Sequence, residues 1–125
     1  MRKVIGYAAG VTLLALTILP GKRVEARAPS TSLYAVSVAA IQSAASHWGV
    51  SYWWLRRVAQ CESGLNPYAY NRWSGATGLF QFMPGTFYAY ARLIGEWRSP
   101  YNAYASANVA GYMFHRGLSY QWACA

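Results

Sequence analysis

Four glycines divide the chain after residue 30 into short segments, and this division limits the fold more than any other feature. Gly49, Gly64, Gly95 and Gly117 each follow a stretch in which apolar residues recur at helical spacing. Because glycine readily adopts the left-handed conformation that ends a helix, the pattern predicts four short helices. A chain of 125 residues that is 55% hydrophobic can bury one core, so we expect one domain.

The first two predicted helices each begin at a capping residue and carry an apolar stripe. Ser30, Thr31 or Ser32 can cap the first helix, and Ser51 can cap the second. The stripes consist of Val38, Ile41, Ala45 and Trp48 in the first helix, and of Leu55, Val58 and Ala59 in the second. Glu62 continues the second stripe at i+7, so the spacing places it on the buried side of its helix.

A turn-rich middle separates these helices from two more. Residues 65–78 are rich in turn-forming residues, and a short extended stretch is expected at 79–82. Pro84 begins a third predicted helix, and Ser99 with Pro100 forms a cap and first-turn proline that opens a fourth. The predicted fold class is mainly α, with a minor β element in the form of a small hairpin or extended segment.

The N-terminal residues have the order of a secretory signal peptide. Arg2 and Lys3 precede an apolar run at 4–19, and Pro20 and Gly21 follow it before a small-residue cleavage site. We expect residues 1–26 to be a signal peptide and residues 27–125 to form the domain, in a secreted or periplasmic protein. The alternative is a retained membrane anchor. Cleavage would leave seven arginines and two glutamates, which lowers the net charge from +8 to +5.

The predicted export of the protein bears on whether its two cysteines form a disulfide or bind a metal. In an oxidising compartment the pair Cys61 and Cys124 favours a disulfide over a metal site. The bridge would close a loop of roughly sixty residues, for which the chain-entropy model gives about 4 kcal/mol. The alternative is a zinc site that also uses His47 and His115, but these four positions lack the close paired spacing of zinc modules. We expect neither a metal nor a cofactor.

Carboxylates are scarce, and this scarcity limits which catalytic and metal-binding sites the chain can form. The chain has no Asp, and its acids are Glu25, Glu62 and Glu96, so calcium loops and two-metal carboxylate sites are excluded. Burial of Glu62 should raise its pKa and favour a protonated acid at neutral pH. The alternative is a structural ion pair between Glu62 and an arginine. Glu96 follows Gly95 and is expected to be solvated in a surface turn.

Two segments of the sequence resemble a known family. They read E-S-G-L-N-P at 62–67 and G-A-T-G-L-F-Q-F-M-P-G-T at 75–86. This pair resembles the soluble lytic transglycosylase family of the lysozyme superfamily, where E-S is followed by G-A-x-G-L-M/F-Q-x-M-P-x-T. The resemblance covers roughly residues 50–117 and implies a lysozyme-like domain with a glycan cleft. It also implies cleavage of the β-1,4 bond between N-acetylmuramic acid and N-acetylglucosamine in peptidoglycan.

The resemblance implies roles for individual residues. Glu62 would be the catalytic acid and later the base. Ser63, which follows it in the motif, would bind the substrate, and Gln81 and Met83 would line the sugar cleft. Asn71 stands near the position at which many relatives have a serine that contacts the substrate.

Other positions match the family pattern or depart from it. Asn108 and Gly111 resemble its N-x-x-G, whereas Ser99 replaces the usual Asp before the proline of that helix, where it still serves as a cap. The family's A-Y-N-A-G element, with its cleft tyrosine, has no counterpart in the sequence. Tyr112 or Tyr120 could stand in for that tyrosine beside the substrate, and the alternative is that both pack in the core.

The two cysteines add a second similarity. The C-E-S at 61–63 and the W-A-C at 122–124 resemble a compact secreted subgroup of the family and the resuscitation-promoting factors. These proteins have a C-E-S and a final W-x-x-C or W-x-C. The similarity supports the bridge between Cys61 and Cys124.

A single carboxylate fits the reaction that the resemblance implies. Most glycosidases use two carboxylates. Here one glutamate would protonate the leaving oxygen and then take the proton from the 6-hydroxyl of the same muramic acid, which yields a 1,6-anhydro sugar. The alternatives are lysozyme-type hydrolysis of the same bond and a non-catalytic protein that binds the cell wall.

Aromatic and basic residues indicate the partner. Rings that flank the motif can stack on sugars, and they are Tyr68, Tyr70, Trp73, Phe80 and Phe82. Among these we expect Phe80 in the core and Trp73 at the cleft or surface. The arginines are scattered, so we expect no nucleic acid, only transient membrane contact through the signal peptide, and attraction of a monomer to anionic peptidoglycan glycan strands.

Overall fold

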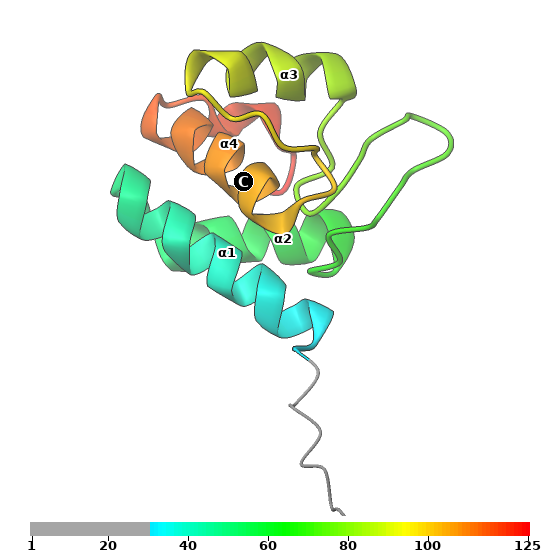
Figure 1. Cartoon of the computed structure of the whole chain (residues 1–125), viewed down its shortest axis with the longest axis horizontal. Helices are drawn as coiled ribbons and strands as arrows, with labels where there is room; N and C mark the ends of the chain where they lie inside the picture. Colours follow the sequence, from blue (N-terminus) through cyan, green and yellow to red (C-terminus); the bar gives the residue numbers. More distant parts are fainter. Residues whose placement is uncertain (1–30) are drawn as a thin grey trace, which may run out of the picture.

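The computed structural model describes residues 31–125, so the predicted signal peptide lies outside the described residues. Four helices make up most of this part of the chain (Figure 1): α1 (Leu33–Trp48), α2 (Tyr52–Ser63), α3 (Pro84–Leu93) and α4 (Ala103–His115). A short 3-10 helix, η1 (Ser119–Gln121), follows α4. The mainly α fold class is confirmed. Over residues 31–125, no helix has both the length and the apolar character needed to cross a membrane.

Serine caps and left-handed glycines define the first two helices, as predicted. The Ser32 hydroxyl accepts the N–H of Ala35 at 3.1 Å, and Ser51 begins α2 in the same way. Gly49 and Gly64 end the helices with φ of 66° and 62°. At such positive φ a side chain would be strained, so glycine fixes both ends.

The start of the fourth helix differs from the prediction. Helix α4 begins at Ala103, and the Asn102 side chain caps it by accepting the N–H of Ala105 at 3.0 Å. Ser99 instead accepts the N–H of Tyr101 within a preceding turn. The carbonyl of Pro100 packs so closely on Gly78 that a Cβ there would collide with it. This tertiary contact keeps Ser99 and Pro100 in the turn, so the prediction that they open the helix was wrong.

Residues 79–82 form a turn and not the extended stretch that we expected. Thr77 and Phe82 exchange backbone hydrogen bonds of 2.9 and 3.0 Å across it. Gln81 has a φ of 51°, which reverses the chain between them. The β structure of residues 31–125 amounts to isolated bridges from Thr77 to Tyr70 and to Phe82.

The core lies between α1, α2 and α4, with α3 and the C-terminal residues closing one side (Figure 1). Its largest fully buried side chains include those of Phe80, Phe87, Ile41, Leu55 and Met113. Phe80 is therefore in the core, as predicted. The indole N–H of Trp122 donates to the Phe80 carbonyl at 2.9 Å, which fixes the end of the chain against the turn at 79–82.

A disulfide joins Cys61 in the last turn of α2 to Cys124, 63 residues later. The predicted pairing is confirmed. Because each sulfur is bonded to the other, the alternative zinc site with His47 and His115 loses two of its ligands. The bridge holds the C-terminal residues beside the end of α2, next to Glu62.

Candidate active site

Glu62 lines a pocket of about 160 Å³ at the carboxyl end of α2. Five parts of the chain meet there: the end of α2, the turn at 79–82, the start of α3, the helix α4 and the C-terminal residues. The lining residues are Glu62, Gln81, Phe82, Met83, Thr86, Met113, Gln121 and Trp122. The pocket therefore brings together three of the residues predicted from the motif, namely Glu62, Gln81 and Met83.

Glu62 has no basic partner in this pocket. The ion pair found among residues 31–125 joins Glu96 and Arg98, so the alternative of a structural pair between Glu62 and an arginine is not met. Partial burial raises the pKa of the Glu62 carboxyl by removing water from its charged form. The environment of Glu62 thus favours the protonated carboxyl, the form that donates a proton, more than water does.

Gln81 is held by hydrogen bonds to backbone carbonyls, and Met83 stands where α3 begins. The Gln81 amide donates to the carbonyls of Ala69 and Gly78 at 3.2 and 3.0 Å, which fixes its side chain at the pocket wall. Met83 directly precedes α3, makes no side-chain capping hydrogen bond, and is 48% exposed. Its thioether is thus available to a ligand at the pocket rim.

Ser63 and Asn71 support the site and do not line this pocket. The Ser63 hydroxyl lies 2.7 Å from the Leu79 carbonyl and donates to it, which ties the end of α2 to the turn at 79–82. The Asn71 side chain accepts the N–H groups of Trp73 and Ser74, and so closes a local turn. Ser63 thus holds the turn that carries Gln81 and Phe82 of the pocket wall, whereas Asn71 shapes the loop that carries Trp73.

The predicted aromatic residues divide between core and surface. Tyr112 lies away from the pocket lining and packs against Trp48, with ring centroids 5.1 Å apart, and against Tyr90. Trp73 is 88% exposed on the loop between α2 and α3, together with Tyr68 and Tyr70. This loop projects from the molecule (Figure 1), in agreement with the exposure of its three rings.

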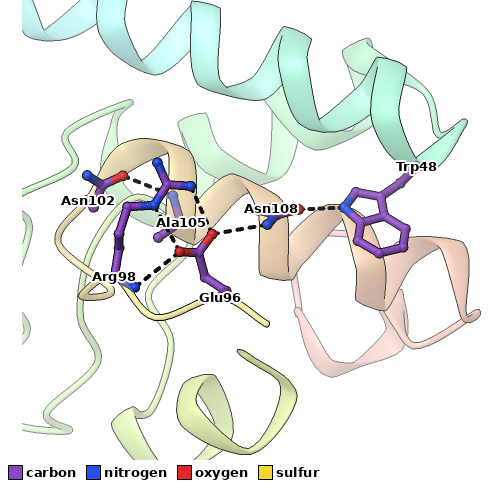
Figure 2. A network of polar contacts seen from close by, with 6 residues as sticks. All are labelled: Trp48, Glu96, Arg98, Asn102, Ala105 and Asn108. Carbon is purple, nitrogen blue, oxygen red and sulfur yellow. Dashed lines mark hydrogen bonds and ion pairs between the residues drawn. The ribbon is translucent and has the colours of Figure 1, made fainter. Parts of the chain in front are cut away.

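Glu96 is not the solvated residue that the sequence indicated. Its side chain is only 3% exposed and forms a two-pronged ion pair with Arg98, with contacts of 2.9 Å. Asn108 donates to the same carboxylate and accepts the indole N–H of Trp48, so a continuous network links the loop after α3 to α4 and α1 (Figure 2). These donors lower the pKa of Glu96 to about 2. Arg98 lies only two residues after Glu96, but Asn108 lies 12 residues away and reaches the carboxylate through the packing of α4, which the local turn pattern could not indicate.

Sequence reasoning missed part of the pocket. Thr86 closes the second motif, and its place in that motif was the available signal. Gln121 and Trp122 lie 59 and 60 residues after Glu62 in the chain. They reach the pocket because the disulfide and the Trp122 hydrogen bond fold the C-terminus back. No local pattern around Gln121 indicated this.

Comparison with known proteins agrees with the geometry. Residues 39–121 match the family model described as the transglycosylase SLT domain. Neither the curated proteins nor the solved structures that were compared gave a significant match. The match spans more than half of the chain, from within α1 to the end of η1. It includes every residue that lines the pocket except Trp122. The chain therefore belongs to the SLT transglycosylase family, whose members act on peptidoglycan.

Proposed function

We propose that this protein is a secreted peptidoglycan lytic transglycosylase in which Glu62 is the single catalytic carboxylate. The observation that carries the proposal is an unpaired, partly buried glutamate in the pocket, with its pKa raised by desolvation. The other carboxylate side chain of residues 31–125, Glu96, is held by Arg98 and Asn108 outside the pocket. One carboxylate is thus available for both proton transfers.

The reaction proceeds by intramolecular displacement. The protonated Glu62 gives its proton to the glycosidic oxygen as the bond between that oxygen and C1 of muramic acid breaks. The 6-hydroxyl oxygen of the same sugar bonds to C1, and its proton passes to the Glu62 carboxylate. The nucleophile is tethered to the reacting carbon, which supplies the effective concentration that a bound water would lack. Glu62 ends in its starting form, and no water is consumed.

The surrounding residues bind and orient the glycan. Gln81 and Met83 line the wall beside Glu62, and Thr86 adds a hydroxyl. Trp73 on the projecting loop supplies an exposed ring for an apolar sugar face. Ser63 and Asn71 act by fixing the turn and the loop that carry these residues. Tyr112 has no part in this arrangement because its contacts lie elsewhere.

The disulfide and the predicted signal peptide support export to the cell wall, with the chain acting as a monomer without a cofactor. Disulfides persist in oxidising compartments outside the cytosol. The bridge between Cys61 and Cys124 also fits the compact secreted subgroup that the sequence resembles. The positive charge of the domain would favour approach to an anionic wall.

Replacement of Glu62 tests the catalytic role. Glu62→Gln keeps the shape of the side chain but removes the transferable proton, so cleavage of purified peptidoglycan should fall by about 100-fold or more. Release of soluble fragments measures the rate. Glu96→Gln is the matched control because it removes the other carboxylate outside the pocket, and it should retain cleavage where the protein is folded.

Two results would redirect the proposal. Equal cleavage by Glu62→Gln and the parent protein would remove Glu62 from the chemistry. Binding of walls by the parent protein without any release of fragments would favour the non-catalytic wall-binding alternative.

A further inference from the structure

The outer face of α2 carries a basic aromatic surface. Residues spaced three and four apart lie on one face of a helix, and this face is opposite the stripe that holds Leu55, Val58 and Glu62. Together with a ring from α1, it forms a surface that we call the α2 patch. Its members are Tyr34, Trp53, Arg56, Arg57 and Gln60. A shallow hollow of about 260 Å³ is bordered by Trp53, Arg56, Arg57 and Gln60.

Arg56 is held between two aromatic rings in the α2 patch. Its guanidinium donates to the Tyr34 hydroxyl at 2.6 Å. The guanidinium carbon lies 5.8 Å from the centre of the Tyr34 ring and 5.6 Å from that of Trp53, within cation–π range. The Trp53 side chain is nevertheless 70% exposed. The patch therefore presents an ordered cation beside an open indole, and little side-chain entropy is lost when a ligand binds.

No carboxylate side chain neutralises the α2 patch within residues 31–125. Glu62 faces the pocket from the opposite side of the helix, and Glu96 is paired with Arg98. Arg56 and Arg57 thus present uncompensated positive charge next to a ring that can stack on an apolar sugar face. The complementary ligand is a carbohydrate that carries carboxylates.

We propose that the α2 patch binds a second peptidoglycan strand, separate from the strand in the catalytic pocket. This inference rests on the proposed function, because it takes peptidoglycan as the polymer that the protein meets. Carboxylates of the peptide stems would pair with Arg56 and Arg57, and a sugar ring would stack on Trp53. Because the patch and Glu62 lie on opposite faces of α2, a neighbouring strand of the wall mesh fits this site. Holding that strand raises the local concentration of bonds that the pocket can cleave.

Co-sedimentation with intact purified walls tests the α2 patch without relying on cleavage. In the Glu62→Gln protein, Trp53→Ala and Arg57→Gln should each raise the Kd for walls about tenfold, the equivalent of about 1.4 kcal/mol. Trp97→Ala and Arg92→Gln are matched controls, since Trp97 is 87% exposed and Arg92 is exposed on α3. Both controls should stay within about twofold of the parent protein. Far-ultraviolet circular dichroism checks that every variant is folded.

The outcomes separate this inference from the proposed function. Equal losses of wall affinity in the patch and control variants would indicate general charge attraction and would overturn the α2 patch as a binding site. Unchanged wall affinity in all four variants would overturn it as well. Trp53-dependent binding to phosphatidylglycerol vesicles, with unchanged wall binding, would assign the patch to a membrane and overturn the proposal. Patch-dependent wall binding by a protein that never cleaves walls would contradict the proposed function alone.

Discussion

At the scale of single residues, hydrogen-bond partners decide how burial acts on the two glutamates. Glu62 lies at the end of α2 and has no basic partner among residues 31–125, and desolvation raises its pKa. The Glu96 side chain is only 3% exposed, yet Arg98 and Asn108 lower its pKa to about 2. Helical spacing could place Glu62 from the sequence. The partner 12 residues after Glu96 could not be predicted, because it depends on how α4 packs.

The ionised Glu96 carboxylate should stabilise the folded protein except at strongly acid pH, where it becomes protonated. The folded pKa of about 2 lies below the ordinary value of 4.5, so the stabilisation is complete above about pH 4.5 and is lost as pH falls through 2. Loss of a charge-assisted hydrogen-bond pair costs about 1.5–3 kcal/mol. We expect Glu96→Gln to lower the Tm by several degrees at pH 7 and to match the parent protein near pH 2. Thermal melts followed by circular dichroism measure this difference, and an equal difference at both pH values would contradict it.

At the scale of helices, the sequence correctly predicted those helix ends that are determined by residues close to them in the chain. Ser32, Ser51, Gly49 and Gly64 act within one turn of the helix ends that they form, and the prediction of α1 and α2 was correct. The start of α4 was predicted three residues early because Ser99 and Asn102 are both good caps. The choice between them is made by the contact of Pro100 with Gly78, from a loop more than twenty residues earlier in the chain.

The contact between α1 and α4 depends on the absence of a side chain at Gly111. A Cβ at this position would lie 2.7 Å from Cδ1 of Trp48 and 3.3 Å from the Cβ of Ala44. Trp48 cannot yield freely because its indole N–H donates to Asn108 at 2.8 Å. We expect Gly111→Ala to lower the free energy of unfolding by about 1–3 kcal/mol, measured by denaturant titration.

Gly85→Ala is the matched control for Gly111→Ala. Gly85 lies in the first turn of α3, where an added Cβ meets nothing within 4 Å. Because alanine favours the helix over glycine, this variant should be unchanged or more stable by up to about 1 kcal/mol. Similar destabilisation of both variants would show that the close approach at Gly111 is not the cause.

At the scale of the whole molecule, the candidate site forms where distant parts of the chain are joined. The motif placed Glu62, Gln81 and Met83 together because they flank one loop. The C-terminal side of the pocket depends on the disulfide between Cys61 and Cys124, which brings Gln121 and Trp122 to the end of α2. The sequence predicted the bridge but not its consequence for the pocket, because the path of residues 117–124 is set by tertiary packing.

The products released from purified peptidoglycan test the central claim most directly, since they show whether the bond is broken by internal displacement or by water. Mass spectrometry of the fragments distinguishes the two, because an anhydro end is lighter than a reducing end by one water. We predict fragments that end in 1,6-anhydromuramic acid, and their absence when Glu62→Gln is used. Fragments with reducing ends alone would contradict the account and favour lysozyme-type hydrolysis.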